Sequence, residues 1–203
     1  AEGKKSLPDP PIASIGYQAS IVITPQQEAD IDIKATLNNL LIPYTSNYAG
    51  TLLPGIREYT VTPGEKTTTI SGKGKAGLKQ EENYYFFYLP VCYKGITGKS
   101  YAYYNTSRSK NLYLPASVDE NYSYDIQLPE NLTLCTPIQE KKIDNPIGSF
   151  KITLTSEGSS LHIELALQIK KQLITPAEYP AFRSLITEWT DRTRKPILFK
   201  TVQ

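Results

Sequence analysis

The 203-residue sequence contains no methionine, one histidine, one tryptophan and two cysteines. A zinc site needs three or four ligands, and His162, Cys92 and Cys135 are too few and too widely spaced to supply a recognisable set. Two cysteines do not make a disulfide framework, so two alternatives stay open: buried free thiols, or one Cys92–Cys135 disulfide in an oxidising compartment. The lack of an initiator methionine predicts that the natural start, with any signal or further domain, lies upstream of Ala1.

Charge and hydrophobicity exclude further classes of protein. The net charge of +2 is too small to indicate nucleic-acid binding through phosphate neutralisation. No apolar run approaches the roughly 18 residues that a membrane span needs, and the polar start AEGKKSLPDPP lacks the pattern of a signal peptide. A hydrophobic fraction of 39% argues against disorder over the whole length. The sequence therefore predicts a folded chain without a cofactor, a nucleic-acid partner or a membrane span.

Catalytic signatures are equally scarce. The GxSxG pattern of serine hydrolases is absent, and KTTTISGKGKAG lacks the spacing of a phosphate-binding loop, so we interpret it as a strand followed by a flexible turn. A nucleophilic pair of His162 with Cys92 or Cys135 is formally possible. However, activated thiols favour helix N-termini or electropositive clefts, whereas Cys92 follows an aromatic run and Cys135 precedes Thr-Pro. The residues thus predict no enzyme activity.

Alternating hydrophobicity dominates what is present. In ADIDIKATL the apolar residues face one side, while Asp30 and Asp32 share the other, which predicts a half-buried strand within a hairpin over residues 16–38. The two carboxylates could hold a cation, but a solvated strand face explains them as well. A second hairpin is predicted in GSFKITLTSEGSSLHIELALQI, with SEGSS at its turn and His162 facing solvent or a rim.

One stretch, LITPAEYPAFRSLITEW, predicts a helix over about residues 175–190. Thr175 is the expected N-cap, Pro176 suits the first helical position, and Glu178 completes a capping box. An apolar stripe at helical spacing comprises Tyr179, Phe182, Leu185, Ile186 and Trp189. DRTRK is expected to end the helix, and PILFKTV to form a final edge strand because of Pro196.

These elements predict a mainly β chain: an antiparallel β-sandwich with one C-terminal amphipathic helix packed on a sheet. Residues 1–14 are rich in proline and polar residues and predict a flexible lead-in. Residues 15–82 are expected to form a β segment or small β domain, and residues 83–203 a β-sandwich domain that includes the helix.

Tyrosine is the most abundant aromatic residue, with 15 in the chain. ENYYFFYLPVCY predicts an aromatic strand, which is central if both of its faces are buried. The alternative is an exposed platform that stacks sugars or bases. Its candidate residues are Tyr84, Tyr85, Tyr88, Tyr101, Tyr103 and Tyr104.

From about residue 84 onward, several segments carry a family resemblance. They are RSKNLYLP, YSYDIQLPENLTLCTP, NPIGSFKITLTSEGSSLHIELALQIKKQLITPAEYPAFRSLITEW and KPILFK. Together they resemble the C-terminal β domain of unknown function that follows a transglutaminase-like domain in exported envelope proteins of Gram-negative gut bacteria. PVCYKG faintly echoes the nucleophile region of such an enzyme domain, but the following helix is missing and no catalytic residue is carried over.

The resemblance implies a non-catalytic accessory or interaction domain of an exported transglutaminase- or protease-like protein, located in the periplasm or on the outer cell surface. The implied partner is an upstream transglutaminase-like domain or another envelope protein. The alternative function is a glycan- or peptide-binding module that uses exposed tyrosines.

Overall fold

The computed structural model describes residues 11–38, 55–92, 96 and 107–202. In these ranges the chain is mainly β, with one helix, which confirms the predicted class. The elements are β1 Ile12–Ile23, β2 Glu28–Asn38, β3 Ile56–Pro63, β4 Thr67–Gly77, β5 Lys79–Glu81, β6 Tyr84–Phe87, β7 Leu112–Tyr113, β8 Ser117–Gln127, β9 Leu132–Leu134, β10 Gln139–Asn145, β11 Gly148–Glu157, β12 Ser160–Ile169, β13 Leu173–Ile174, α2 Tyr179–Arg194 and β14 Ile197–Thr201.

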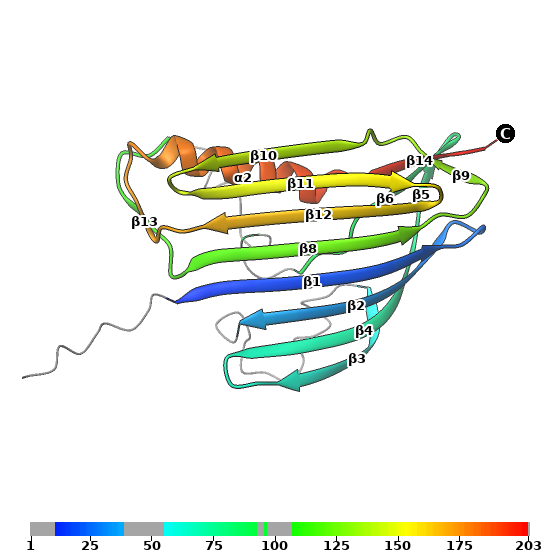
Figure 1. Ribbon diagram of the computed structural model, residues 1–203, viewed down its shortest axis with the longest axis horizontal. Coiled ribbons are helices and arrows are strands. Elements are labelled where there is room, and N and C mark those ends of the chain that lie inside the picture. The colour runs from blue at the N-terminus through cyan, green and yellow to red at the C-terminus, as the bar shows by residue number, and fades with distance from the viewer. Residues whose placement is uncertain (1–10, 39–54, 93–95, 97–106, 203) are drawn as a thin grey trace, which may run out of the picture.

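The largest element is an eight-stranded sheet in the order β10-β11-β12-β8-β1-β2-β4-β3 (Figure 1). Its neighbouring strands are antiparallel except for β1 and β8, which run parallel. This pair joins strands from the predicted segments 15–82 and 83–203 in a single sheet. Strand β1 also begins inside the predicted 1–14 lead-in, of which residues 1–10 lie outside the described part.

Both predicted hairpins are confirmed. Ile21 pairs with Ile31 in the β1–β2 hairpin, and Phe150 pairs with Leu167 in the β11–β12 hairpin, whose turn contains Gly158 at φ +58°. Period-two alternation places the apolar side chains of these strands on one buried face and the polar ones on the other.

The buried face of the large sheet is covered by α2 and by a four-stranded sheet in the order β5-β6-β14-β9 (Figure 1). Tyr17 and Tyr122 stack with ring centroids 5.2 Å apart, and Tyr122 contacts Trp189 of α2 at 5.6 Å. The predicted apolar stripe of the helix is fully inside this core, because all five of its residues are buried. The opposite face of the large sheet is polar.

The predicted helix start was wrong. Helix α2 begins at Tyr179, and residues 175–178 form a turn closed by a 3.1 Å bond from Glu178 N–H to the Thr175 carbonyl. Glu178 is the N-cap residue, and its side chain reaches back to accept bonds of 3.0 Å from both Thr175 N–H and Thr175 Oγ1. The threonine hydroxyl therefore donates to the carboxylate and does not cap the helix, although the glutamate half of the predicted capping box is present.

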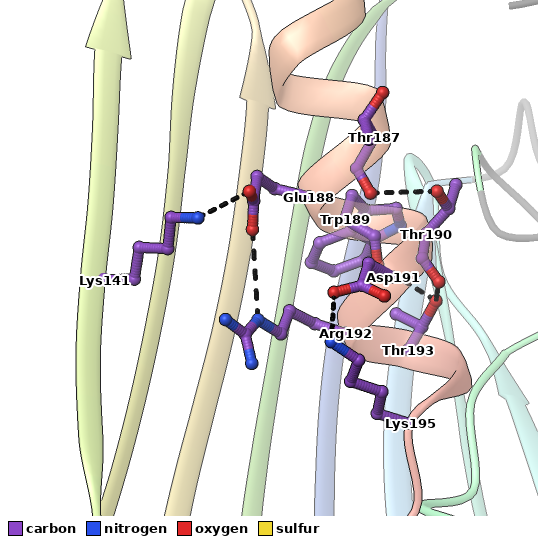
Figure 2. Close-up of polar contacts among 9 residues, drawn as sticks. All are labelled: Lys141, Thr187, Glu188, Trp189, Thr190, Asp191, Arg192, Thr193 and Lys195. Carbon is purple, nitrogen blue, oxygen red and sulfur yellow. Dashed lines mark hydrogen bonds and ion pairs between the residues drawn. The ribbon is translucent and has the colours of Figure 1, made fainter. Parts of the chain in front are cut away.

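The helix also ends later than predicted. Asp191, Thr193 and Lys195 extend the bonding pattern, since Lys195 N–H donates to the Asp191 carbonyl at 3.1 Å. Thr193 Oγ1 donates to the Trp189 carbonyl at 3.1 Å (Figure 2). A salt bridge of 2.7 Å between Lys195 and Asp191 supports this last turn (Figure 2). The stop comes from Pro196, which holds Lys195 in an extended conformation with ψ 128°.

Two strand predictions also need correction. β14 is an inner strand that pairs with both β6 and β9, because Pro196 precedes the strand and its missing N–H lies outside the ladder. The expected flexible turn after KTTTIS is instead the second half of β4. Its glycines allow β3 to approach closely: a Cβ at Gly74 would lie 2.3 Å from the Gly55 carbonyl oxygen.

Candidate interaction surface

The structure divides the predicted tyrosine surface. Tyr84 and Tyr88 are exposed, at 43% and 49%, whereas Tyr85 is buried in the core and cannot contact a ligand. Strand β6 is therefore buried on one face only, so the condition for a strand buried on both faces is not met, and the placement of Tyr85 on a binding surface was wrong. Tyr101, Tyr103 and Tyr104 lie outside the described residues.

Strand alternation explains the division. Tyr85 and Phe87 point to the core, while Tyr84, Phe86 and Tyr88 share the opposite side of the four-stranded sheet, with Phe86 half-buried. Neighbouring strands add side chains to the same side, because cross-strand partners share a face. Lys79 and Leu198 pair with Phe86, and Lys200 pairs with Tyr84. We call this surface the aromatic face: Lys79, Tyr84, Phe86, Tyr88, Leu198 and Lys200.

The aromatic face combines rings with positive charge. Lys79 Nζ lies 5.3 Å from the centroid of the Tyr88 ring, a cation–π distance. A depression of about 490 Å³ lies beside Tyr84 and Lys200, and its other lining residues are Asn83, Thr133, Thr201 and Val202. Such a surface can pack apolar groups or the flat side of a sugar on its rings and pair an anion with its lysines. The sequence signal for Phe86 was its period-two spacing with Tyr84 and Tyr88.

A second polar arrangement lies on the outer face of the large sheet. His162 Nδ1 is 2.7 Å from Asp125 Oδ1, and His162 Nε2 is 3.5 Å from Glu164 Oε1. Lys151 forms a 3.1 Å salt bridge with the same glutamate. We call these four residues the polar cluster. The hydrogen bond that His162 donates to the Asp125 carboxylate raises the pKa of His162, and the bonds that Glu164 accepts from Lys151 and His162 lower the pKa of Glu164.

The two cysteines are not joined in a disulfide, and both lie apart from the polar cluster. Cys92 is fully buried and interacts electrostatically with Tyr17 and Tyr124 on the inner side of the large sheet, whereas His162 projects from its outer side. Cys135 is half-buried, and its backbone N–H donates to the Leu198 carbonyl in the small sheet. Neither thiol is placed by the fold to be activated by the histidine.

The predicted Asp30 and Asp32 pair lies on the solvated face. Asp30 forms a 2.8 Å salt bridge with Lys75, and Asp32 lies 3.6 Å from Lys73. Lysine partners fit the solvated-strand interpretation better than a cation site. Among the residues that the structure describes, no cluster of three or more histidine, cysteine, aspartate or glutamate side chains could hold a metal.

One buried charge was missed by sequence reasoning. Glu120 lies on the inner face of β8, is completely buried, and accepts a hydrogen bond from the Ile96 N–H. The alternating pattern of β8 indicates this burial, since Glu120 is two residues from both Val118 and Tyr122 and therefore points to the core as they do. A carboxylate in an otherwise apolar row is rarely tolerated without dedicated partners. Glu120 therefore ties Ile96 to the sheet.

Comparisons with known proteins identify the second half of the chain. Residues 83–199 match the family DUF3858, described as a domain of unknown function with a solved structure. The fold is similar to a crystal structure of "a putative protease" from Parabacteroides distasonis, with 31% sequence identity and a TM-score of 0.54. That match covers 60% of this chain and 24% of the Parabacteroides chain, so this chain spans about a quarter of its length. A search of curated proteins found no match. Among the described residues, no helix is long and apolar enough to cross a membrane.

Proposed function

The chain belongs to the DUF3858 family, and from this we propose that it is a non-catalytic accessory domain of a longer, exported protein with a transglutaminase- or protease-like enzyme domain. The observation that carries the proposal is the match to the Parabacteroides protein. It includes 60% of this chain but only 24% of a much longer one. Similarity confined to one module of a larger protein is the pattern of an accessory domain.

The aromatic face is the surface through which this domain contacts its enzyme domain or another envelope protein. Exposed aromatic residues close together on a folded surface are typical of interfaces, where Tyr and Phe supply contact area at little entropic cost. Tyr84 and Phe86 lie on strand β6, which is held in register by pairing with β14 on one side and β5 on the other, and Tyr88 directly follows this strand. The contact surface is therefore preorganised, which favours binding.

Placement of the titratable groups supports a non-catalytic role. The imidazole of His162 already contacts two carboxylates, and both cysteines lie away from it. A thiol nucleophile needs a base within hydrogen-bond reach, and the described structure supplies that to neither cysteine. Export to the periplasm or outer surface belongs to the same proposal and is supported by the family resemblance.

A second candidate function is glycan or peptide binding by the same face. It is favoured by the depression beside Tyr84, where a ring, a lysine and hydroxyl groups converge. A glycan or peptide array, probed with the wild-type chain and with a Tyr84→Ser, Tyr88→Ser double variant, separates this function from a domain contact. Ligand-specific signals lost in the double variant support binding, and an array without such signals refutes it.

The test of the accessory role uses the natural full-length protein and an amine-reactive cross-linker. Lys79 and Lys200 flank the aromatic face, so we expect their cross-links to reach residues outside this chain, as read by mass spectrometry. Lys151, on the outer face of β11 where it pairs with Glu164, is the control and should not form them. The Tyr84→Ser, Tyr88→Ser variant should weaken the Lys79 and Lys200 cross-links. A full-length reading frame without an enzyme domain would overturn the accessory role.

The non-catalytic part is tested separately, by amine-incorporation and peptide-hydrolysis assays on the 203-residue chain. We expect the wild type and a Cys92→Ala, Cys135→Ala, His162→Ala triple variant to give the same background signal. Turnover that disappears in the triple variant would refute the proposal.

A further inference from the structure

A groove on the side of α2 has the properties of a peptide-binding site. It is about 510 Å³ in volume and lies between the first turns of α2, the edge strand β10 and the segment at residues 107–108. Ile143, Pro176, Tyr179 and Pro180 supply its apolar lining, and Ser107, Ser184 and Thr187 supply hydroxyl groups. Helix α2 begins on the β13 side of the molecule, away from β6 and β14, so the groove is separate from the aromatic face (Figure 1).

Charge in the groove is predominantly positive. Arg108 and Arg183 both line it, and the exposed Arg183 has no salt bridge to any described residue. The acidic residue in the lining is Glu188, and its carboxylate is already neutralised by a salt bridge to Lys141 and by Arg192 Nε at 3.9 Å (Figure 2). Two guanidinium groups therefore face the groove, and the Glu188 carboxylate does not neutralise them because it already pairs with Lys141 and Arg192.

The guanidinium group of Arg108 has a hydrogen-bond donor without an acceptor among the described residues. Its guanidinium carbon lies 5.9 Å from the centroid of the buried Tyr179 ring, which fixes the side chain against the helix. Its Nε is buried and has no hydrogen-bond partner within the part of the chain that the structure describes. A buried donor on a permanently charged group is costly to leave unpaired, and a carboxylate is the acceptor that matches guanidinium geometry.

We propose that the α2 groove binds an acidic peptide segment of a partner protein, with Arg108 and Arg183 pairing its carboxylates. The apolar lining favours a peptide over a free inorganic anion, because it offers contact for the side chains between the carboxylates. From Pro180 to Glu188 the helix rises about 12 Å, the length of about four extended residues. The hydroxyl groups along this length can bond the peptide backbone.

The test measures fluorescence anisotropy of a labelled tetrapeptide of alternating leucine and glutamate, titrated with the 203-residue chain. We expect saturable binding that weakens as NaCl is raised from about 50 mM to 500 mM. Arg183→Ala should lower affinity at least about tenfold, as should Arg108→Ala. Arg57→Ala is the matched control on the distant strand β3 and should leave the affinity unchanged.

Arg183 is exposed, so its variant keeps the test valid if Arg108→Ala, which removes the contact with Tyr179, fails to fold. The proposal is overturned if the probe does not bind at about 1 mM protein, or if both Arg183→Ala and Arg57→Ala bind like the wild type. Equal binding of a leucine–lysine peptide would overturn the charge requirement. Displacement by acetate at an equal carboxylate concentration would overturn the requirement for a peptide. The aromatic-face variant Tyr84→Ser, Tyr88→Ser should bind the probe normally, which keeps this result independent of the proposed function.

Discussion

Replacing Trp189 by alanine tests how the two layers of the fold are joined. The indole is fully buried on the inner side of α2, and its ring contacts Tyr122 of the central strand β8 at 5.6 Å. Tyr122 in turn stacks on Tyr17 of β1. Trp189→Ala therefore removes the side chain that connects the helix to the middle of the large sheet.

The expected loss follows from the cavity that the substitution leaves. Replacing a buried Trp or Phe by alanine costs about 3–5 kcal/mol, with the higher values at sites that cannot collapse. Here the floor of the cavity is a sheet in which β8 is paired along its whole length with β1 and β12, so its strands cannot move toward the helix independently. We therefore expect a loss in the upper half of that range. Phe182→Ala, at another fully buried position, should also cost about 3–5 kcal/mol.

Urea unfolding followed by circular dichroism measures this loss. At a slope of about 2–3 kcal/mol per M, a loss of about 4–5 kcal/mol should lower the midpoint by about 1.3 to 2.5 M for Trp189→Ala. Arg183→Ala, on the exposed side of the same helix, is the control and should change the free energy of unfolding by less than about 0.5 kcal/mol. A loss below about 1 kcal/mol for Trp189→Ala, with an unchanged slope, would refute the role of the helix as the second layer of the core.

Three further predictions concern the sheets and the thiols. The pKa of His162 is raised in the folded protein, so its contribution to stability is complete below about pH 6.5 and is lost as the pH rises through the folded-state pKa. In urea melts, the unfolding free energies of the wild type and His162→Gln should therefore converge as the pH rises through that range. A difference that stays constant with pH would contradict this. Gly148→Ala puts a Cβ 1.8 Å from the Gln168 carbonyl oxygen and should lower the unfolding free energy by about 1–3 kcal/mol. Gly77→Ala is the control and should be neutral, because a Cβ there has nothing within 4 Å. Equal unfolding free energies for the two variants would contradict the β11–β12 register. In thiol titration without reductant, Cys135 should react in the native protein and Cys92 only after unfolding; fewer than two reactive thiols in denaturant would indicate a disulfide.

Local patterns predicted the strands and the helix because the physical cause of each lies within a few residues. Alternation in ADIDIKATL follows from one buried and one solvated face, and the stripe from Tyr179 to Trp189 follows from packing on a sheet. The helix ends were predicted less well, because competing signals lie close together there. Thr175 and Glu178 form a turn before the helix, and the terminating effect of Pro196 acts after DRTRK, which has helical bonding.

Features that depend on distant residues were not predictable from one sequence. The parallel pairing of β1 with β8 joins residues about a hundred positions apart, and it makes one sheet of two segments that the sequence suggested were separate. The exposure of Tyr84 and Tyr88 required knowing which side of β6 the core occupies. The α2 groove joins Arg108 to the helix across about seventy positions, and no pattern in either segment signals the other.

The helix also shows how one element can serve stability and recognition without conflict. Phe182 and Arg183 are adjacent in sequence, yet one is fully buried and the other exposed, because successive helical residues point about 100° apart. The core therefore depends on the stripe that faces the sheet, while the groove depends mainly on the side that faces solvent, with Tyr179 the one residue of the stripe that also lines the groove. A substitution at Arg183 can abolish peptide binding in a protein that unfolds like the wild type, since sites without shared partners contribute independently. If Arg183→Ala instead lowered binding and stability together, the two sides of α2 would be coupled and the groove would have to be regarded as part of the core.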